Sequence, residues 1–155
     1  MLRSAWGPDP AEFQGRVYTV PRSNIRPKPV QPGGPPILLG SFAPKAVERA
    51  ARIADGLNPI ALSYDFLAGA LGRFRAAAEA AGRGRLLVMA RANVPVTAEP
   101  LGDDRRFLGG SPEQIADDLK RVEELDVDQV FFSNRVPCPV DDELRLLERL
   151  RTAYP

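Results

Sequence analysis

A short loop between an expected strand and an expected helix is the strongest candidate for chemistry in this sequence. Residues 36–40, PILLG, form an apolar run typical of a buried strand, and Pro44 begins a helical pattern. Gly40, Ser41 and Phe42 lie between them. A glycine lets the backbone approach an anion closely, and the first amides of a helix are unpaired donors at the positive end of its dipole. The loop therefore fits a phosphate cradle, but it also fits a plain bend in which Ser41 helps to cap the helix.

A second glycine-containing loop offers the same chemistry less clearly. Gly109, Gly110 and Ser111 precede a helical pattern that begins at Pro112. Serine at the N-cap, proline at the first helical position and Gln114 three residues after the serine predict a capping box, which already accounts for Ser111. We therefore keep Gly110 and Ser111 as a weak phosphate-binding candidate beside the capping interpretation.

Polar residues also gather near the ends of the third and fourth expected strands. In parallel βα folds, ligands bind where the carboxyl ends of the strands meet the following loops. Polar side chains at strand ends are also common on plain surfaces, so simple solvent exposure is the competing interpretation. The residues concerned are Arg91, Asn93, Ser133, Asn134 and Arg135.

Groups for acid-base or metal chemistry are scarce. The sequence contains no histidine, and Cys138 is its single cysteine, which excludes histidine triads, histidine zinc sites and an internal disulfide. Asp117 and Asp118 are expected on a solvated helix face, and Arg105 and Arg106 in a solvated loop. We predict no metal site and leave the catalytic residues unassigned.

The overall composition is that of a small globular protein with an apolar core. The chain has 155 residues, of which 44% are hydrophobic. Its 21 basic and 20 acidic residues nearly cancel and form no long block, so we expect neither a nucleic acid nor a membrane partner. No segment has the pattern of a spanning helix or a secretory signal, and a cytoplasmic location is expected.

Residues 36–155 alternate apolar runs with helical periodicities, which predicts four βα units around a parallel sheet. The expected fold class is therefore α/β, with half of the eight units of a TIM barrel. Expected strands cover 36–40, 57–62, 85–94 and 128–134, and Gly56 and Gly82 are expected to end the first two helices. The expected apolar stripes of the four helices are Val47, Ala50, Ile53 and Ala54; Leu67, Leu71, Phe74 and Ala78; Ile115, Leu119, Val122 and Leu125; and Leu144, Leu147 and Leu150.

Residues 1–35 differ from the rest and are expected to form an N-terminal hairpin and a proline-rich arm. The run 13–20, FQGRVYTV, is β-like on either side of a glycine turn, and prolines crowd the segment that follows. Proline removes amide donors, so this segment is expected to run extended rather than as a helix or a central strand. Trp6, Phe13 and Tyr18 are expected to be its packing anchors.

Three stretches together resemble the luciferase-like monooxygenase superfamily of flavin- and deazaflavin-dependent oxidoreductases. The first is PVQPGGPPILLGSFAPKAVERAARIADG, residues 29–56, with a proline-rich lead-in, a PPI strand, a glycine turn and an Ala-Asp-Gly end. RFLGGSPEQIADDLKRVEELDVDQVFF, residues 106–132, resembles the closing segment of the family, and WGPDPAEFQGRVYTV, residues 6–20, resembles the stretch that leads into it. The order and spacing of the three match the family.

The resemblance implies an oxidoreductase or monooxygenase with an eight-unit barrel. Such proteins bind flavin mononucleotide or the deazaflavin coenzyme of the F420 type at the carboxyl ends of the strands. The family's Gly-Gly turn lends amides to the cofactor phosphate, which implies the same role for Gly40 and Ser41, with Phe42 beside them. Here the second glycine of the turn is Ser41, which adds a side chain where the anion would approach.

The resemblance begins in the middle of a family protein, so the sequence corresponds to a C-terminal half barrel. Four strands alone leave two edges and one uncovered face, and exposed apolar surface costs about 25 cal/mol per Å². We expect cover from a second copy in a dimer, from a separate N-terminal half, or from a rearranged sheet with the arm folded over it. Two functions stay open: an oxidoreductase that acts only when completed by a partner, and a non-catalytic half barrel that serves as a binding or assembly module.

Overall fold

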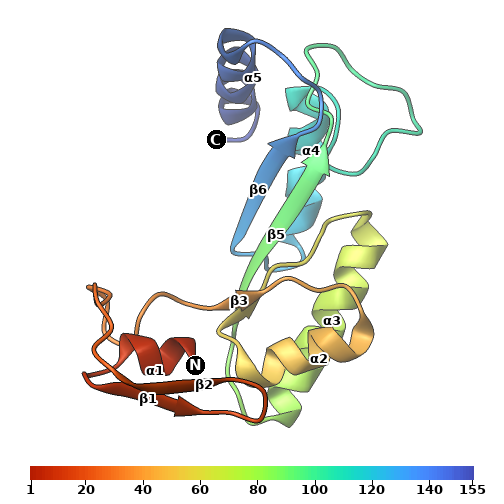
Figure 1. Cartoon of the computed structure of the whole chain (residues 1–155). Helices are drawn as coiled ribbons and strands as arrows, with labels where there is room; N and C mark the ends of the chain where they lie inside the picture. The colour runs from red at the N-terminus through yellow and green to blue at the C-terminus, as the bar shows by residue number, and fades with distance from the viewer. The chain divides into compact units, whose positions relative to one another are not determined.

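The computed structural model describes residues 1–155 and divides them into two compact units, Met1–Pro36 and Ile37–Pro155. The first unit contains helix α1 (Leu2–Trp6) and a hairpin of strands β1 (Ala11–Gln14) and β2 (Thr19–Ser23) (Figure 1). Phe13 pairs with Val20 across the antiparallel ladder, which confirms the expected hairpin. The short helix α1 was not expected, because five residues carry too little periodicity to predict one.

Asp9 fastens the proline-rich arm to the rest of the first unit. Its carboxylate lies 2.7 Å from the Lys28 ammonium and accepts a hydrogen bond from the Ile25 amide at 3.1 Å. Of the expected anchors, Trp6 lies against Gly34, where an added Cβ would come within 3.0 Å of the indole ring. Tyr18 is 69% exposed, so its expected anchoring role is wrong; it lies in the turn that joins β1 to β2.

The second unit contains four βα units and one parallel sheet, which confirms the partial barrel (Figure 1). The strands lie in the order β3, β4, β5, β6, so β3 and β6 are the two edges. The sheet keeps chain order, without the rearrangement that was considered. The elements are β3 (Leu38–Leu39), α2 (Pro44–Ile53), β4 (Gly56–Leu57), α3 (Tyr64–Ala80), β5 (Leu87–Val94), α4 (Pro112–Glu123), β6 (Gln129–Asn134) and α5 (Val140–Ala153).

The core lies between the helices and one face of the sheet. Alternate residues of β5 are buried against the helices: Val88, Ala90, Ala92 and Val94. Helix α3 buries the whole stripe expected from its sequence, Leu67, Leu71, Phe74 and Ala78. None of the helices is long and apolar enough to span a membrane.

Two details of the first βα unit differ from expectation. Ile53 is 54% exposed, and Ala51 is buried beside Val47, Ala50 and Ala54 in its place. Gly56 lies in β4 rather than at the helix cap, and a Cβ at this position would collide with the Leu87 carbonyl and come within 2.9 Å of the Leu87 Cβ. Close approach of two strands therefore explains this glycine.

The expected stripe of α5 is largely wrong. Leu144 is 53% exposed and Leu147 is 49% exposed, whereas Leu146 is buried and Leu150 packs against the core. Leu146 and Leu150 are four residues apart and share one helix face. Helix α5 thus contacts the core through a narrow face, and Leu144 and Leu147 stay exposed to solvent.

Candidate functional site

The register of the sheet brings the candidate loop level with the end of β4 and with the amino half of β5. Leu39 pairs with Leu57, which pairs with Val88, so Gly40 is level with Asn58 and Met89. The Asn58 amide group donates to the Met89 carbonyl at 2.5 Å. A Cβ built on Gly40 would lie 3.6 Å from the Asn58 carbonyl oxygen. The loop after β3 therefore opens beside the carboxyl end of β4, whereas β5 and β6 continue beyond this level.

The first turn of α2 is rich in unused hydrogen-bond donors. Ala43 is the N-cap, and no side chain caps the helix, so Ser41 does not have the capping role of the plain-bend interpretation. The backbone amides of Ser41, Phe42, Ala43 and Lys45 donate to no protein group, and the half-buried Ser41 hydroxyl makes no hydrogen bond. These donors lie just before and within the first turn of α2, at the positive end of the helix dipole. The arrangement can hold an anion.

Gly40 has no local reason to be glycine. Its φ is not positive, and a Cβ there would make only ordinary contacts. Neither backbone strain nor crowding within the chain requires it. A glycine in such a place fits close approach of something from outside the chain.

The other three helices that follow strands differ from α2 at their first turns. Ser63 caps α3 and is followed by Asp65, and Ser111 caps α4 ahead of Glu113. Helix α5 begins with three acidic residues, Asp141, Asp142 and Glu143. Acidic side chains in the first turn interact favourably with the positive end of the helix dipole, and their negative charge repels a bound anion. Only α2 combines an uncapped start with no acidic residue and a lysine in its first turn.

The weaker candidate loop is occupied by its own capping box. Ser111 is fully buried, its amide donates to the Gln114 side-chain oxygen at 3.1 Å, and its hydroxyl donates to Glu113 at 2.8 Å. Gly110 has a φ of 116°, which only glycine adopts easily. Phosphate binding by Gly110 and Ser111 stays a prediction, and their donors are engaged within the chain.

Asp118 and Arg105 form a buried ion pair, so the expectation that both are solvated is wrong. Asp118 is 5% exposed, its carboxylate lies 2.5 Å from the Arg105 guanidinium, and it accepts the Leu108 amide at 2.7 Å. The spacing contained a signal: Asp118 lies three residues after Ile115 and four before Val122, on the buried face of α4. The pair fastens the loop between β5 and α4.

The polar residues at the strand ends divide between the two sides of the sheet. Arg91, Asn93 and Ser133 lie on the side away from the helices. Asn134 faces the other side and accepts the amides of Val96 and Val136, each at 3.0 Å. Arg135 follows β6, and its amide donates to the Val94 carbonyl. Asn134 is therefore a structural residue, whereas the first three are free to meet a ligand.

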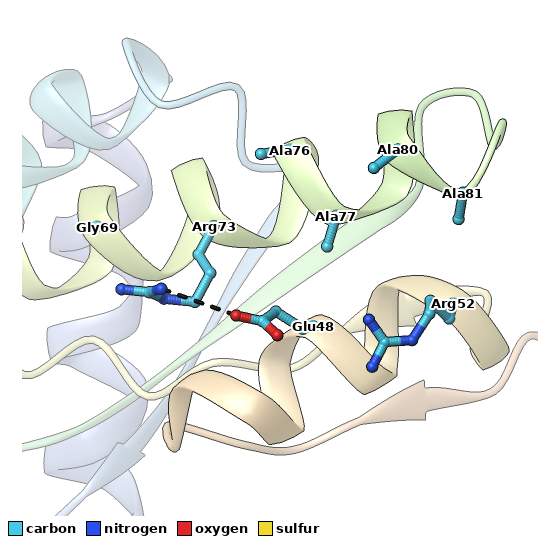
Figure 2. Close-up of a pocket in the computed structure, with 8 residues that line it drawn as sticks. All are labelled: Glu48, Arg52, Gly69, Arg73, Ala76, Ala77, Ala80 and Ala81. Atoms are coloured by element: carbon cyan, nitrogen blue, oxygen red, sulfur yellow. Dashed lines mark ion pairs between the residues drawn. The ribbon is translucent and has the colours of Figure 1, made fainter.

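The outer surfaces of α2 and α3 enclose a groove of about 660 Å³ (Figure 2). Small residues of α3 and the following turn form much of it, among them Gly69, Ala76 and Ala80. One exposed ion pair, Glu48 to Arg73 at 3.8 Å, crosses it. The groove contains none of the candidate phosphate-binding residues.

Comparison with known families decides the affiliation of the chain. The profile of the family described as luciferase-like monooxygenase matches residues 1–101, about two thirds of the sequence. The chain belongs to the luciferase-like monooxygenase family. No curated protein sequence gives a significant match.

Solved structures similar to this member of the family include three oxidoreductases. An F420-dependent secondary alcohol dehydrogenase in complex with an F420-acetone adduct has a TM-score of 0.80 and 14% identity, with 99% of this chain and 59% of the other covered. The coenzyme F420-dependent tetrahydromethanopterin reductase from Methanopyrus kandleri has a TM-score of 0.78 and 14% identity, covering 96% and 58%. Monooxygenase RslO1 from Streptomyces bottropensis has a TM-score of 0.73 and 16% identity, covering 98% and 57%.

These likenesses show the fold. The chain spans less than two thirds of each of these structures, as its open four-stranded sheet also indicates. The family member described here therefore contains part of the barrel found in its structural relatives.

Proposed function

We propose that the chain provides the phosphate end of a deazaflavin or flavin site in an oxidoreductase of the luciferase-like type. The supporting observation is the uncapped start of α2, where four backbone amides and the Ser41 hydroxyl have no partner in the chain. Two of the similar structures are described as F420-dependent, which favours the deazaflavin over flavin mononucleotide. When bound, such a cofactor supplies the hydride chemistry.

The role of this chain toward the cofactor is to hold and orient its phosphate. The amides of Ser41, Phe42 and Ala43 would donate to phosphate oxygens, and Gly40 would leave room for their approach. The exposed Lys45 adds a positive charge to the same helix turn. Ser41, where the family has glycine, fits as an additional donor.

Completion of the site requires βα units outside this chain. Strands β3 and β6 are open edges, and the side of the sheet away from the helices has no cover within Ile37–Pro155. A second copy in a dimer is the first candidate for this cover, and a separate N-terminal half is the other. We retain a cytoplasmic location as part of the proposal.

Cofactor titration with two matched variants tests the proposal. Gly40→Glu places a carboxylate at the proposed phosphate position and should weaken binding of F420 or flavin mononucleotide at least tenfold, measured by cofactor fluorescence. Gly84→Glu is the control, because Gly84 is exposed between α3 and β5, and a Cβ there meets nothing within 4 Å. Equal affinities of the two variants would contradict the phosphate assignment.

A second function, a non-catalytic binding or assembly module, is favoured by one observation. Helix α5, which packs against α4, exposes Val140, Leu144 and Leu147, as an assembly surface would. Failure of the wild-type chain to bind either cofactor, alone or with its completing partner, would favour this module.

A further inference from the structure

The side of β5 and β6 away from the helices carries a second cluster of unused donors. We call this side the open face; the residues that alternate with the buried ones form it, and Phe131, for example, is 38% exposed. The residues of this side lie opposite one another on the two strands, since Met89 pairs with Gln129 and Asn93 pairs with Ser133. The residues of the open face are Leu87, Met89, Arg91 and Asn93 on β5, and Gln129, Phe131 and Ser133 on β6.

Three donors gather at the carboxyl end of the open face. Asn93 and Ser133 are direct cross-strand partners, and Arg91 lies two residues earlier on the same face as Asn93. Backbones of such neighbours lie about 5 Å apart across the strands and about 7 Å apart along them, so one small group can reach all three side chains. None of the three side chains makes a hydrogen bond or an ion pair within the chain, and Arg91 is exposed. An arginine fork, a side-chain amide and a hydroxyl are a donor set for an oxyanion.

An apolar floor adjoins these donors. Phe131 is the direct partner of Arg91 across the strands, and Met89 precedes Arg91 by two residues on the same face. No acidic residue lies on the open face. The surface therefore suits a molecule with an apolar body and a negatively charged group at one end.

The cluster lies apart from the proposed phosphate cradle. Strand β5 is two strands away from β3, and β6 is three strands away, which corresponds to about 10 to 14 Å across the sheet. Arg91 and Asn93 also lie two and four residues beyond the level of Gly40 along β5. One phosphate therefore cannot contact both places. Since ligands of parallel βα barrels bind at this end of the strands, the second anion belongs to another part of the cofactor-substrate pair.

We propose that Arg91, Asn93 and Ser133 form a subsite for the oxyanion group of an acidic organic substrate. The assignment to a substrate rests on the proposed function, because it places the cofactor phosphate at α2. Arg91 provides the charge, Asn93 and Ser133 fix the orientation, and Met89 and Phe131 contact the apolar body.

Side-chain and amide NMR on the purified full chain tests this subsite with three probes at constant ionic strength: benzoate, inorganic phosphate and benzyl alcohol. Benzoate should shift the Arg91 Nε signal and the amide signals of Asn93 and Ser133, and benzyl alcohol should shift them far less. Arg91→Met should weaken benzoate binding about tenfold, the usual effect of losing one charge-assisted hydrogen bond. Arg49→Met is the matched control, since Arg49 is exposed on α2 without a partner, and it should bind benzoate like the wild type.

The proposal fails if Arg91→Met binds benzoate as tightly as the wild type does. It also fails if benzoate leaves the Arg91 signal unchanged, as it would if a carboxylate of a covering chain already paired with the Arg91 guanidinium. The proposal fails as well if phosphate saturates the cluster of Arg91, Asn93 and Ser133 but benzoate does not bind there. That result would make this cluster the cofactor phosphate site. Ser133→Ala, expected to weaken benzoate binding severalfold, gives a second readout if Arg91→Met does not fold.

Failure of this subsite and failure of the proposed function are distinguishable. If Gly40→Glu loses cofactor binding, Arg91→Met keeps it, and benzoate causes no response at Arg91, then the subsite is wrong and the proposed function stands. If the chain binds neither cofactor but binds benzoate in a way that depends on Arg91, then the proposed function is wrong and the oxyanion site is supported.

Discussion

Asp118 holds the loop after β5 against α4 with both of its carboxylate oxygens. One oxygen meets Arg105 and the Leu108 amide, and the other lies 3.2 Å from the same guanidinium. A buried carboxylate is expensive unless it is paired, and here the pairing is complete. The ordered loop in turn contacts the carboxyl end of the sheet, because Val96 bridges to Gly110.

Removal of this carboxylate should be strongly destabilising. Asp118→Ala leaves the Arg105 guanidinium without its counter-charge and the Leu108 amide without its acceptor, and we expect a loss of about 3 kcal/mol in the free energy of unfolding, measured by urea titration. Its neighbour provides the control: Asp117 is exposed and pairs only with Lys120, so Asp117→Ala should cost less than about 0.5 kcal/mol. Similar losses in the two variants would show that the Asp118 pair is not buried in solution.

At the residue scale, local chemistry could be predicted where one short motif determines it. Ser111 caps its helix as the sequence predicts, and the capping box of Ser111 and Gln114 is complete. Asp118 was missed because two adjacent acids suggest a solvated face, although its spacing places it among apolar residues. The sequence could not decide between free amides beside Ser41 and a cap made by Ser41, since only coordinates show that no side chain caps α2.

Strands β5 and β6 are joined at their amino ends by Asp128. Its carboxylate accepts the Val88 amide at 2.7 Å and lies 2.7 Å from Arg85. Partial burial works to raise the pKa of Asp128, but the hydrogen bonds from Val88 and Arg85 outweigh it, so the pKa lies below its ordinary value. Asp126 binds the same guanidinium, and this hydrogen bond lowers the pKa of its carboxyl too.

These lowered pKa values predict a loss of stability in acid. A carboxyl group whose pKa is lower in the folded state stabilises the fold above its unfolded pKa of about 3.9, and this contribution disappears as the pH falls through the folded value. Asp128→Asn should reduce the free energy of unfolding at pH 7 by about 1 kcal/mol and flatten its decline below about pH 4. The exposed Asp103→Asn is the control, and an unchanged acid decline in Asp128→Asn would contradict the assignment.

At the element scale, the sequence predicted the helices and strands whose pattern is long. The stripe of α3 and the runs of β5 and β6 were recognised because each repeats over several turns or residue pairs. The buried face of α5 was predicted wrongly, because leucines at several phases share this helix and only packing selects Leu146. Helix α1 is too short to have a periodicity.

The whole molecule is half of a closed architecture. Counting βα units in the sequence predicted the parallel sheet and its two open edges, and the sheet order β3, β4, β5, β6 confirms both. The character of the open face could not be predicted, because a one-residue shift of register exchanges the two faces of every strand. Val88, Val130 and Phe132 face the helices, and the open face combines an apolar floor with polar donors.

We expect an open sheet of this kind to be covered by another chain. Unpaired backbone groups at the edges of β3 and β6, and exposed Leu87 and Phe131 between them, are costly in water. Exposed leucines on α5 extend the apolar surface beyond the sheet. A second copy of the chain would cover both edges at once if β6 of each copy paired with β3 of the other.

Sedimentation equilibrium of the purified chain at micromolar concentration shows whether a second copy covers the open sheet. We expect a folded dimer, with twice the mass of the chain, that dissociates only together with loss of structure. A folded, compact monomer over the whole concentration range would contradict it, because the open sheet would then be stable without cover.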